Sequence, residues 1–262
     1  MLVDCHVHLD PFLDEEVDGI LYRAREVGVK FVISAGTTLA SCQRSLYLST
    51  KFSDFFTGIG LHPMNLENKF TEKTYEELKS LAIASPKVLA VSEIGLDFME
   101  GAPDRSIQYD AFRQQIRLAR ELKLPIIFHS REAHDEVFRI LKEERAYEVG
   151  GIMHYFQGTQ YDADRIADLD FYISLARPLL RLQHLQEVAT KTPLSRIVLE
   201  TDSAPQPFKK KRENWTEPRH TRTIAEKLAL LKRCNISEIE KSTTDNMKAL
   251  LDEKWRLISQ TT

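Results

Sequence analysis

The alternation of short apolar segments with amphipathic segments most constrains what this chain can fold into. Eight segments rich in β-branched residues recur along the 262 residues, each followed by apolar residues at helical spacing. The predicted strands cover residues 2–8, 29–34, 55–61, 87–95, 124–130, 150–156, 171–176 and 195–202. Several are continuously apolar, as in strands of a parallel sheet that are buried on both faces. Eight such units in one chain predict a single-domain (β/α)8 TIM barrel spanning residues 1–262.

Helical periodicity fills the intervals between these strands. Helices are predicted over residues 39–51, 71–84, 132–145, 160–168 and 179–190, with a long helix around Ile224 and a helical tail over 237–256. An open, doubly wound sheet is the alternative architecture. No Gly-x-Gly-x-x-Gly motif follows the first predicted strand, which disfavours that alternative.

Composition excludes several classes of protein. A net charge of −3 means that any contact with nucleic acid requires a local site rather than a general positive field. The three cysteines are few and far apart, which indicates a reducing compartment rather than a disulfide framework. No apolar run reaches the length of a membrane span, and the first residues lack the pattern of a signal peptide. We therefore expect a cytoplasmic protein with no membrane partner.

Histidines and carboxylates gather where the predicted strands end. In a TIM barrel the functional site lies at the C-terminal ends of the strands. His6 and His8 end the first strand, and alternate residues of a strand point to the same side. The other strand-end residues of this kind are His62, Glu93, His129, His154 and Asp202.

Each of these residues alone has an ordinary structural explanation. A lone buried histidine is more often a hydrogen-bonded core residue than a ligand, Glu93 can serve an ion pair, and Asp202 can cap a helix. Burying four histidines and two carboxylates together without a counter-charge is costly, and metal ions remove that cost. The donor types suit divalent cations such as Zn, Mn or Mg. We set His62 apart from the six predicted ligands.

Several motifs, in this order and spacing, carry a resemblance to a known family. They are DCHVHLD (4–10), GIGLHP (58–63), VSEIGLDF (91–98), FHSREAHDE (128–136), HYFQGT (154–159), LETDSAP (199–205) and TTDNMKALL (243–251). Together they span nearly the whole chain. The chain resembles the TatD family of metal-dependent deoxyribonucleases, within the amidohydrolase-type barrels.

The resemblance implies roles for the matching residues. One metal ion would be held by His6, His8 and Asp202, a second by His129 and His154, with Glu93 bridging the two. His62 and Arg131 would contact substrate, and Glu200 would lie near the site. The chain departs from the family pattern at Tyr155, where a cysteine is usual, and in the segments SLARPLL (174–180) and 203–218.

Two metal ions about 3.5–4 Å apart make a bridging water into hydroxide, the expected nucleophile, and stabilise charge on a phosphoryl oxygen. The two cations and two carboxylates leave a charge of roughly +2, which attracts a phosphodiester. We assign Asp202 a second role as general base and expect Glu200 to position ligands. Asp97 is expected to fix the loop after the fourth strand rather than to take part in catalysis.

The loop after the last predicted strand carries the run Lys209, Lys210, Lys211 and Arg212, followed by Trp215. A solvent-exposed charged loop is the ordinary explanation. At the mouth of the site, however, the run is placed to bind the phosphates of a single strand, with Trp215 stacking on a base.

The resemblance implies hydrolysis of DNA phosphodiesters, from the 3′ end of single-stranded DNA. Two alternatives stay open. The same metal site serves a hydrolase of a small amide, lactone or phosphoester equally well, because site chemistry alone does not separate these bonds. The barrel can also act mainly as a subunit of a larger complex. The sequence does not distinguish DNA from RNA.

Overall fold

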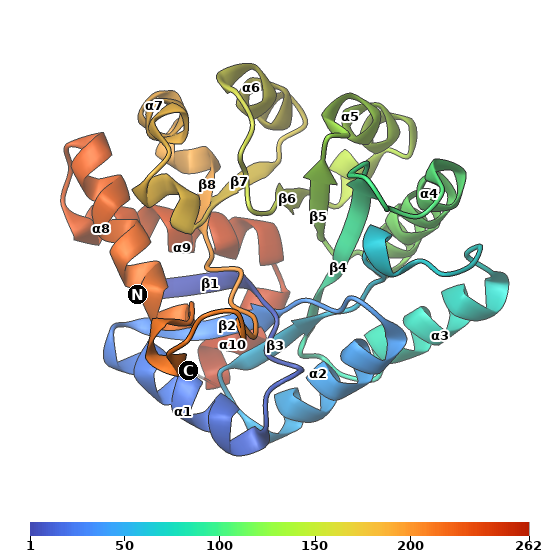
Figure 1. The fold of residues 1–262 in the computed structure, drawn as a ribbon, viewed down its shortest axis with the longest axis horizontal. Helices are drawn as coiled ribbons and strands as arrows, with labels where there is room; N and C mark the ends of the chain where they lie inside the picture. Colours follow the sequence, from blue (N-terminus) through green and yellow to red (C-terminus); the bar gives the residue numbers. More distant parts are fainter. Residues whose placement is uncertain (262) are drawn as a thin grey trace.

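The computed structural model describes residues 1–261 and confirms the predicted barrel. Eight strands pair in parallel and in sequence order. They are β1 (Leu2–Val7), β2 (Val29–Ser34), β3 (Phe55–Gly58), β4 (Val88–Asp97), β5 (Ile126–Arg131), β6 (Gly151–Met153), β7 (Tyr172–Leu175) and β8 (Ile197–Leu199). Figure 1 shows the strands at the centre with helices α1 to α8 around them. Each parallel neighbour is therefore reached through a helical crossover.

The ring of strands closes between its two ends. Val7, the last residue of β1, forms an isolated parallel bridge with Ser203, just beyond β8. The backbone N–H of His8 donates to the Ser203 carbonyl at 2.7 Å, and that of Asp202 donates to the His6 carbonyl at 3.0 Å. This closure places His6 and His8 beside Asp202, although these residues lie at opposite ends of the barrel sequence.

The helices follow the predicted spacing. They are α1 (Asp14–Glu26), α2 (Leu39–Lys51), α3 (Glu72–Ile83), α4 (Arg105–Leu122), α5 (His134–Glu143), α6 (Gln160–Asp168), α7 (Gln183–Lys191), α8 (Thr221–Lys232), α9 (Ile236–Leu251) and α10 (Lys254–Thr261). Two predictions need correction. The helix predicted over 179–190 is a 3₁₀ turn, η3 (Arg177–Leu180), followed by α7, and the predicted tail is divided at Asp252, whose φ of 42° ends α9. Within residues 1–261, no helix combines the length and apolar character needed to cross a bilayer.

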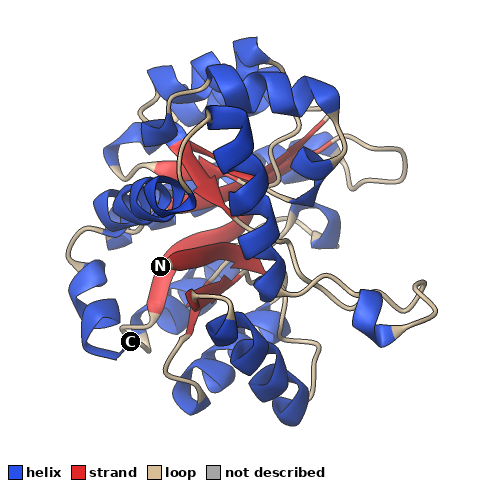
Figure 2. Cartoon of the chain, turned by 90° about the vertical axis from the view of Figure 1, so that its left-hand side faces the viewer, coloured by secondary structure: helices blue, strands red, loops and turns tan. Residues whose placement is uncertain are grey.

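The interior of the barrel is apolar at one end and polar at the other. One cluster of buried side chains takes at least one residue from every strand, including Val3, Phe31 and Val198. Met247 of α9 and Ile258 of α10 join this cluster near the starts of the strands. Figure 2 shows the strands enclosed by helices from the side. Because the starts of the strands are sealed, only their C-terminal ends are left for a polar site.

Candidate metal centre

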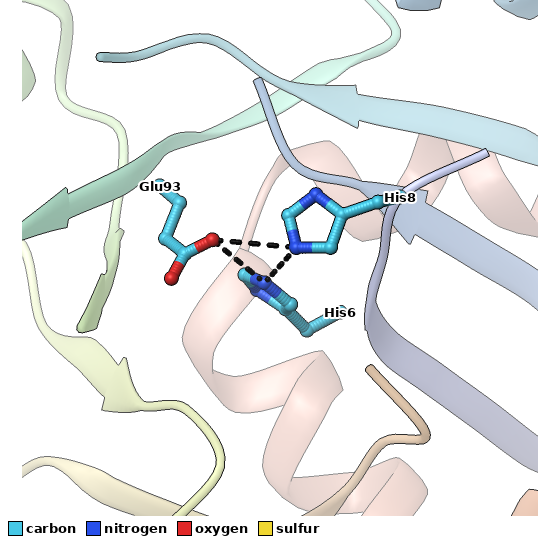
Figure 3. Close-up of side chains that lie close together, drawn as sticks. All are labelled: His6, His8 and Glu93. Atoms are coloured by element: carbon cyan, nitrogen blue, oxygen red, sulfur yellow. Dashed lines mark hydrogen bonds and ion pairs between the residues drawn. The ribbon is translucent and has the colours of Figure 1, made fainter. Parts of the chain in front are cut away.

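Donor atoms from β1, from β4 and from the residues that follow β1 and β8 gather at one place, and Figure 3 shows those of His6, His8 and Glu93. The Nε2 atoms of His6 and His8 lie 3.2 Å apart, and each is 3.3 Å from Oε2 of Glu93. Oδ1 of Asp202 is 3.3 Å from Nε2 of His8 and 3.9 Å from Nε2 of His6. A tetrahedron with metal–ligand bonds of about 2.1 Å has edges of about 3.4 Å. The donors of His6, His8 and Glu93 therefore have the spacing that a single divalent cation requires, and Asp202 lies beside both histidines.

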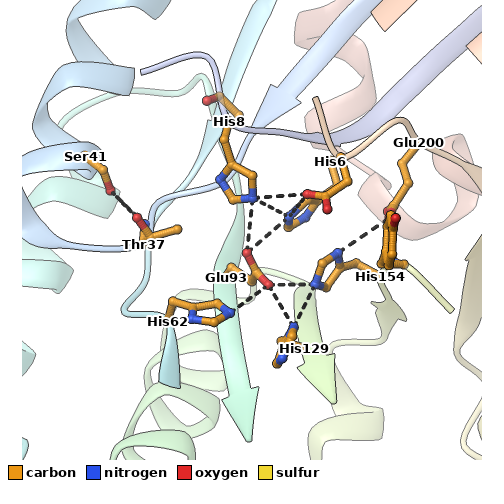
Figure 4. Close-up of polar contacts among 12 residues, drawn as sticks. His6, His8, Thr37, Ser41, His62, Glu93, His129, His154 and Glu200 are labelled. Atoms are coloured by element: carbon orange, nitrogen blue, oxygen red, sulfur yellow. Dashed lines mark hydrogen bonds and ion pairs between the residues drawn. The ribbon is translucent and has the colours of Figure 1, made fainter. Parts of the chain in front are cut away.

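A second group faces the other oxygen of Glu93 (Figure 4). Nε2 of His154 lies 2.6 Å from Oε1, and Nδ1 of His129 lies 3.3 Å from the same oxygen. The two imidazole nitrogens are themselves 3.3 Å apart. Each oxygen of Glu93 thus faces a different set of donors, which is the arrangement a bridging carboxylate needs.

His62 lies as close to Glu93 as His129 does, but its hydrogen bonding differs. Its Nε2 is 3.2 Å from Oε1 of Glu93. Its Nδ1 accepts the backbone N–H of Met64 at 3.1 Å. A neutral His62 therefore carries its proton on Nε2, where it is a hydrogen-bond donor and not a ligand. This hydrogen bond supports setting His62 apart from the predicted ligands.

A buried carboxylate orients His129, and another lies beside His154. Nε2 of His129 lies 2.8 Å from Oδ2 of Asp97, which leaves Nδ1 free to face Glu93. Oδ1 of Asp97 also accepts the N–H of Met99 at 3.0 Å, as the predicted loop-fixing role requires. Oε1 of Glu200 lies 3.5 Å from Nδ1 of His154.

Sequence reasoning missed the contact between Asp97 and His129, although a signal for it existed. The two residues end neighbouring strands, and His129 is in register with Gly95, two residues before Asp97. Side chains at such positions are within reach of each other across a sheet.

The motif Glu-Ile-Gly-Leu-Asp brings β4 close to β5. Gly95 has a φ of 139°, and a Cβ atom there would lie 2.0 Å from the carbonyl oxygen of His129. Only glycine permits this approach. The glycine between Glu93 and Asp97 therefore lets both carboxylates meet the same histidine.

Both carboxylates of the centre are held in the ionised form. Burial alone would raise the pKa of Glu93, but the surrounding histidines, His154 foremost, hold it well below its ordinary value. Burial likewise opposes ionisation of Asp202, and a hydrogen bond with His8 lowers the pKa of Asp202 to about 2.

The carboxylates of the centre in turn stabilise the charged forms of His8 and His154. Burial disfavours a charged His8, yet hydrogen bonds with Asp202 and Glu93 raise its pKa to about 10. Burial also opposes the charge on His154, and the carboxylate of Glu93 raises the pKa of His154 well above its ordinary value. The centre thus demands positive charge, which protons supply in part and divalent cations would supply in full. Donor types, spacing and charge all fit a metal site.

A pocket with a volume of about 850 Å³ opens onto this centre. Its walls include the predicted residues His8, His62, Glu93, His129, Arg131, His154 and Asp202. They also include residues that were not predicted, among them Asp10, Thr37, Asn65, Ser130, His134 and Tyr155. His6 and Glu200 are fully buried behind the pocket wall. A volume of this size accommodates a ligand as large as a nucleotide.

The predicted substrate run after β8 does not line the pocket. Lys211 pairs with Glu213 at 3.6 Å. Arg212 pairs with Glu217 at 3.2 Å, and its guanidinium lies 4.3 Å from the centre of the Trp215 ring. Arg212 therefore has partners within the chain, and Arg212 and Trp215 stay predicted substrate contacts.

Trp215 also packs against Phe12, with ring centres 6.1 Å apart, and lies partly buried against an apolar cluster beside α1. The ring is thus in contact with both Arg212 and Phe12. Lys209, Lys210 and Lys211 likewise remain predicted substrate contacts.

Comparisons with known proteins agree with this geometry. A family model described as TatD related DNase matches residues 3–252. The chain is 35% identical to the uncharacterized metal-dependent hydrolase YabD of Bacillus subtilis, over 95% of this chain and 98% of the relative. It is 31% identical to the 3′–5′ ssDNA/RNA exonuclease TatD of Erwinia tasmaniensis, over 90% of this chain and 93% of that protein. Among solved structures, the TatD homologue YjjV of Escherichia coli K12 superposes with a TM-score of 0.86 and 30% identity, covering 95% of this chain and 97% of the other.

Proposed function

Because this chain belongs to the TatD family of metal-dependent hydrolases, we propose that it cleaves DNA phosphodiester bonds at a two-metal centre. We further propose that it acts as a 3′-to-5′ exonuclease on single-stranded DNA, an activity that the name of the Erwinia relative suggests. One observation carries the proposal: the two oxygens of Glu93 face separate groups of donor atoms.

In this proposal the donor groups hold one cation each. The first cation would bind His6, His8 and Asp202, the second would bind His129 and His154, and Glu93 would bridge them. Bound divalent cations supply Lewis acidity toward a phosphoryl oxygen and lower the pKa of water. Zn, Mn and Mg are all compatible with these nitrogen and oxygen donors.

The remaining residues act on substrate and protons. Asp202 lines the pocket in its ionised form, as a general base must, and accepts a proton from the attacking water. His62 presents its Nε2 proton at the pocket wall, where it donates to a phosphate oxygen. Arg131 lines the same pocket and pairs with a second phosphate oxygen. Glu200 keeps His154 in its orientation.

The cysteines bear on the cellular compartment. Cys5, Cys42 and Cys234 are all free thiols, and two of them are buried. Free thiols persist in reducing compartments. We therefore keep the cytoplasm as the proposed location.

The test is an assay on 5′-labelled single-stranded and duplex DNA with Mg²⁺, Mn²⁺ or Zn²⁺. The wild type should shorten the single strand from its 3′ end, which gives a ladder of labelled products. Glu93→Ala should abolish the ladder because it removes the bridging carboxylate.

Glu144→Gln is the matched control, since Glu144 is another buried glutamate, bound to Arg113 and Arg117 at a distance from the pocket. It should cut as the wild type does. If the wild type cuts no DNA with any metal, or Glu93→Ala cuts as fast as the wild type, the nuclease proposal fails.

A further inference from the structure

Two segments beside the pocket carry cations that the centre does not use. Arg177 begins η3 and Arg181 follows its last residue, and η3 comes shortly after the C-terminal end of β7. Phe208, Lys209 and Lys210 lie in the loop that follows β8. Both segments leave the barrel at the end where the metal centre lies.

A shared hydrogen-bond acceptor ties the two segments together. Nη1 of Arg177 donates to Oγ1 of Thr216 at 3.2 Å. Nε2 of Gln206 donates to the same oxygen at 3.2 Å, and its neighbour Pro205 lines the pocket. The positive charge of Arg177 also reaches Lys209, whose pKa is lowered by burial and then by that charge. Arg177 and Lys209 therefore lie near each other, and Arg181 and Lys210 belong to the same two segments.

The surface of these two segments lacks the carboxylates that balance cations elsewhere in the molecule. Among the described residues, no carboxylate oxygen lies within 4.0 Å of the charged nitrogens of Arg177, Arg181, Lys209 or Lys210. Nζ of Lys209 donates to the carbonyl oxygen of Asn214, at 3.0 Å. Positive charge left unpaired in one place is a binding site for a polyanion.

The loop that carries residues 208–210 also borders the pocket. Ala204 and Pro205, in the same loop, line the pocket, and Tyr155 lines it as well. A strand that leaves the pocket along this loop therefore reaches the surface.

An aromatic ring completes the surface. Phe208 is 79% exposed, next to Lys209 and Lys210. Proteins that bind single-stranded nucleic acid combine cations that follow the backbone with aromatic rings on which bases stack. Trp215 is partly buried against Phe12, whereas Phe208 is exposed.

We propose that Arg177, Arg181 and the segment 208–210 bind a single strand of nucleic acid outside the metal pocket. The four cations contact successive phosphates, and Phe208 stacks on a base. This inference rests on the proposed nuclease function, because it assumes that the strand continues from the pocket. It assigns substrate binding to segments in which the chain departs from the TatD family pattern.

Binding of a labelled 12-nucleotide oligothymidylate, followed by fluorescence anisotropy in Ca²⁺ over a series of salt concentrations, tests the surface. Arg177→Gln with Arg181→Gln should weaken binding about tenfold and reduce the slope of log K against log salt by about 1.4, the value for two phosphate contacts. Phe208→Ala should weaken binding about tenfold with little change of slope, and Phe208→Trp should restore it.

The matched control removes two positive charges from the other end of the barrel. Lys123 and Arg233 follow the C-terminal ends of α4 and α8, both have a φ of 54°, and neither has a carboxylate partner among the described residues. Lys123→Gln with Arg233→Gln should leave both affinity and slope as in the wild type. If the control loses as much affinity as the arginine variant, or the arginine variant loses none, the surface is refuted.

Cleavage separates this inference from the nuclease proposal. On 5′-labelled DNA, the arginine variant should lose about tenfold more kcat/KM on a 12-nucleotide strand than on a dinucleotide, because only the longer strand reaches the surface. Equal losses on both substrates overturn the surface and leave the nuclease intact. A wild type that binds the strand at this surface but cuts neither substrate overturns the nuclease and leaves the surface.

Discussion

Two buried glutamates, Glu93 and Glu144, are surrounded by different cations. Glu93, 3% exposed, faces imidazoles on every side, the nearest being Nε2 of His154 at 2.6 Å. Glu144, 7% exposed, binds Nε and Nη2 of Arg117 and Nη1 of Arg113, each at 2.8 Å. Guanidinium keeps its proton at every physiological pH, whereas imidazole can release its proton and coordinate a metal ion. The kind of cation, not the degree of burial, distinguishes a structural carboxylate from one that can serve a metal.

The largest difference between the two glutamates should appear in metal content. Glu93→Gln removes a charge shared by both donor groups, so we expect loss of both metal ions and a fall in DNA cleavage of about 10³-fold or more. His8→Ala should cost one ion and spare the other. Metal analysis of purified protein measures this directly. Glu144→Gln should keep the wild-type metal content. Equal metal loss in the two glutamine variants would contradict the view that Glu93 serves a metal and Glu144 does not.

Asp97 tests whether the orientation of a ligand matters as well as its presence. Asp97→Asn keeps the size of the side chain but removes the charge that holds Nε2 of His129. We expect metal affinity to fall about 10- to 100-fold, the usual cost of losing such a support. A competition titration with a chelating dye measures this affinity. Unchanged affinity, with the fold intact by circular dichroism, would show that Asp97 serves only the loop.

The free energy of unfolding should fall in Glu144→Gln, although this variant keeps its metal content. Glu144→Gln breaks a two-point contact with Arg117 and a further bond to Arg113. We expect the free energy of unfolding at pH 7 to fall by about 2 kcal/mol, while cleavage at 25 °C is retained. Denaturant titration of the metal-free protein supplies the number. A variant as stable as the wild type would mean that the negative charge of Glu144 makes no measurable contribution to the free energy of unfolding.

The smallest expected effect is the pH dependence of the stability that Glu144 contributes. Hydrogen bonds from Arg117 hold the pKa of Glu144 below its ordinary value in the folded protein. Its contribution to stability is therefore complete above the unfolded-state pKa of about 4.3 and is lost as the pH falls through the folded-state pKa. The stability difference between the wild type and Glu144→Gln should be full at pH 7 and shrink below about pH 4. A constant difference across this range would contradict ionic pairing.

Most of the fold could be predicted because it follows from the hydrophobic pattern of neighbouring residues. The remainder could not, because it depends on contacts between residues far apart in the sequence. The strand ends that carry His6, Glu93 and Asp202 could be found because hydrophobic runs and barrel geometry determine where side chains emerge. The environment of Trp215 could not, because its ring packs on Phe12, near the other end of the chain. The tautomer of His62 was equally hidden, since it depends on one backbone N–H of Met64.

The seam between β1 and the segment after β8 has a consequence for motion. Among the described residues, its backbone is joined by one isolated bridge and a few hydrogen bonds, which include the amides of His8 and Asp202. Such a seam is where a barrel opens most readily in transient local unfolding. A cation bound by His6, His8 and Asp202 would have ligands on both sides of this seam. Because it would bind the closed barrel and not the locally opened one, it would stabilise the closed state. Hydrogen exchange of these two amides would then slow as metal is added. Metal binding at the centre would thus also stabilise the closed barrel.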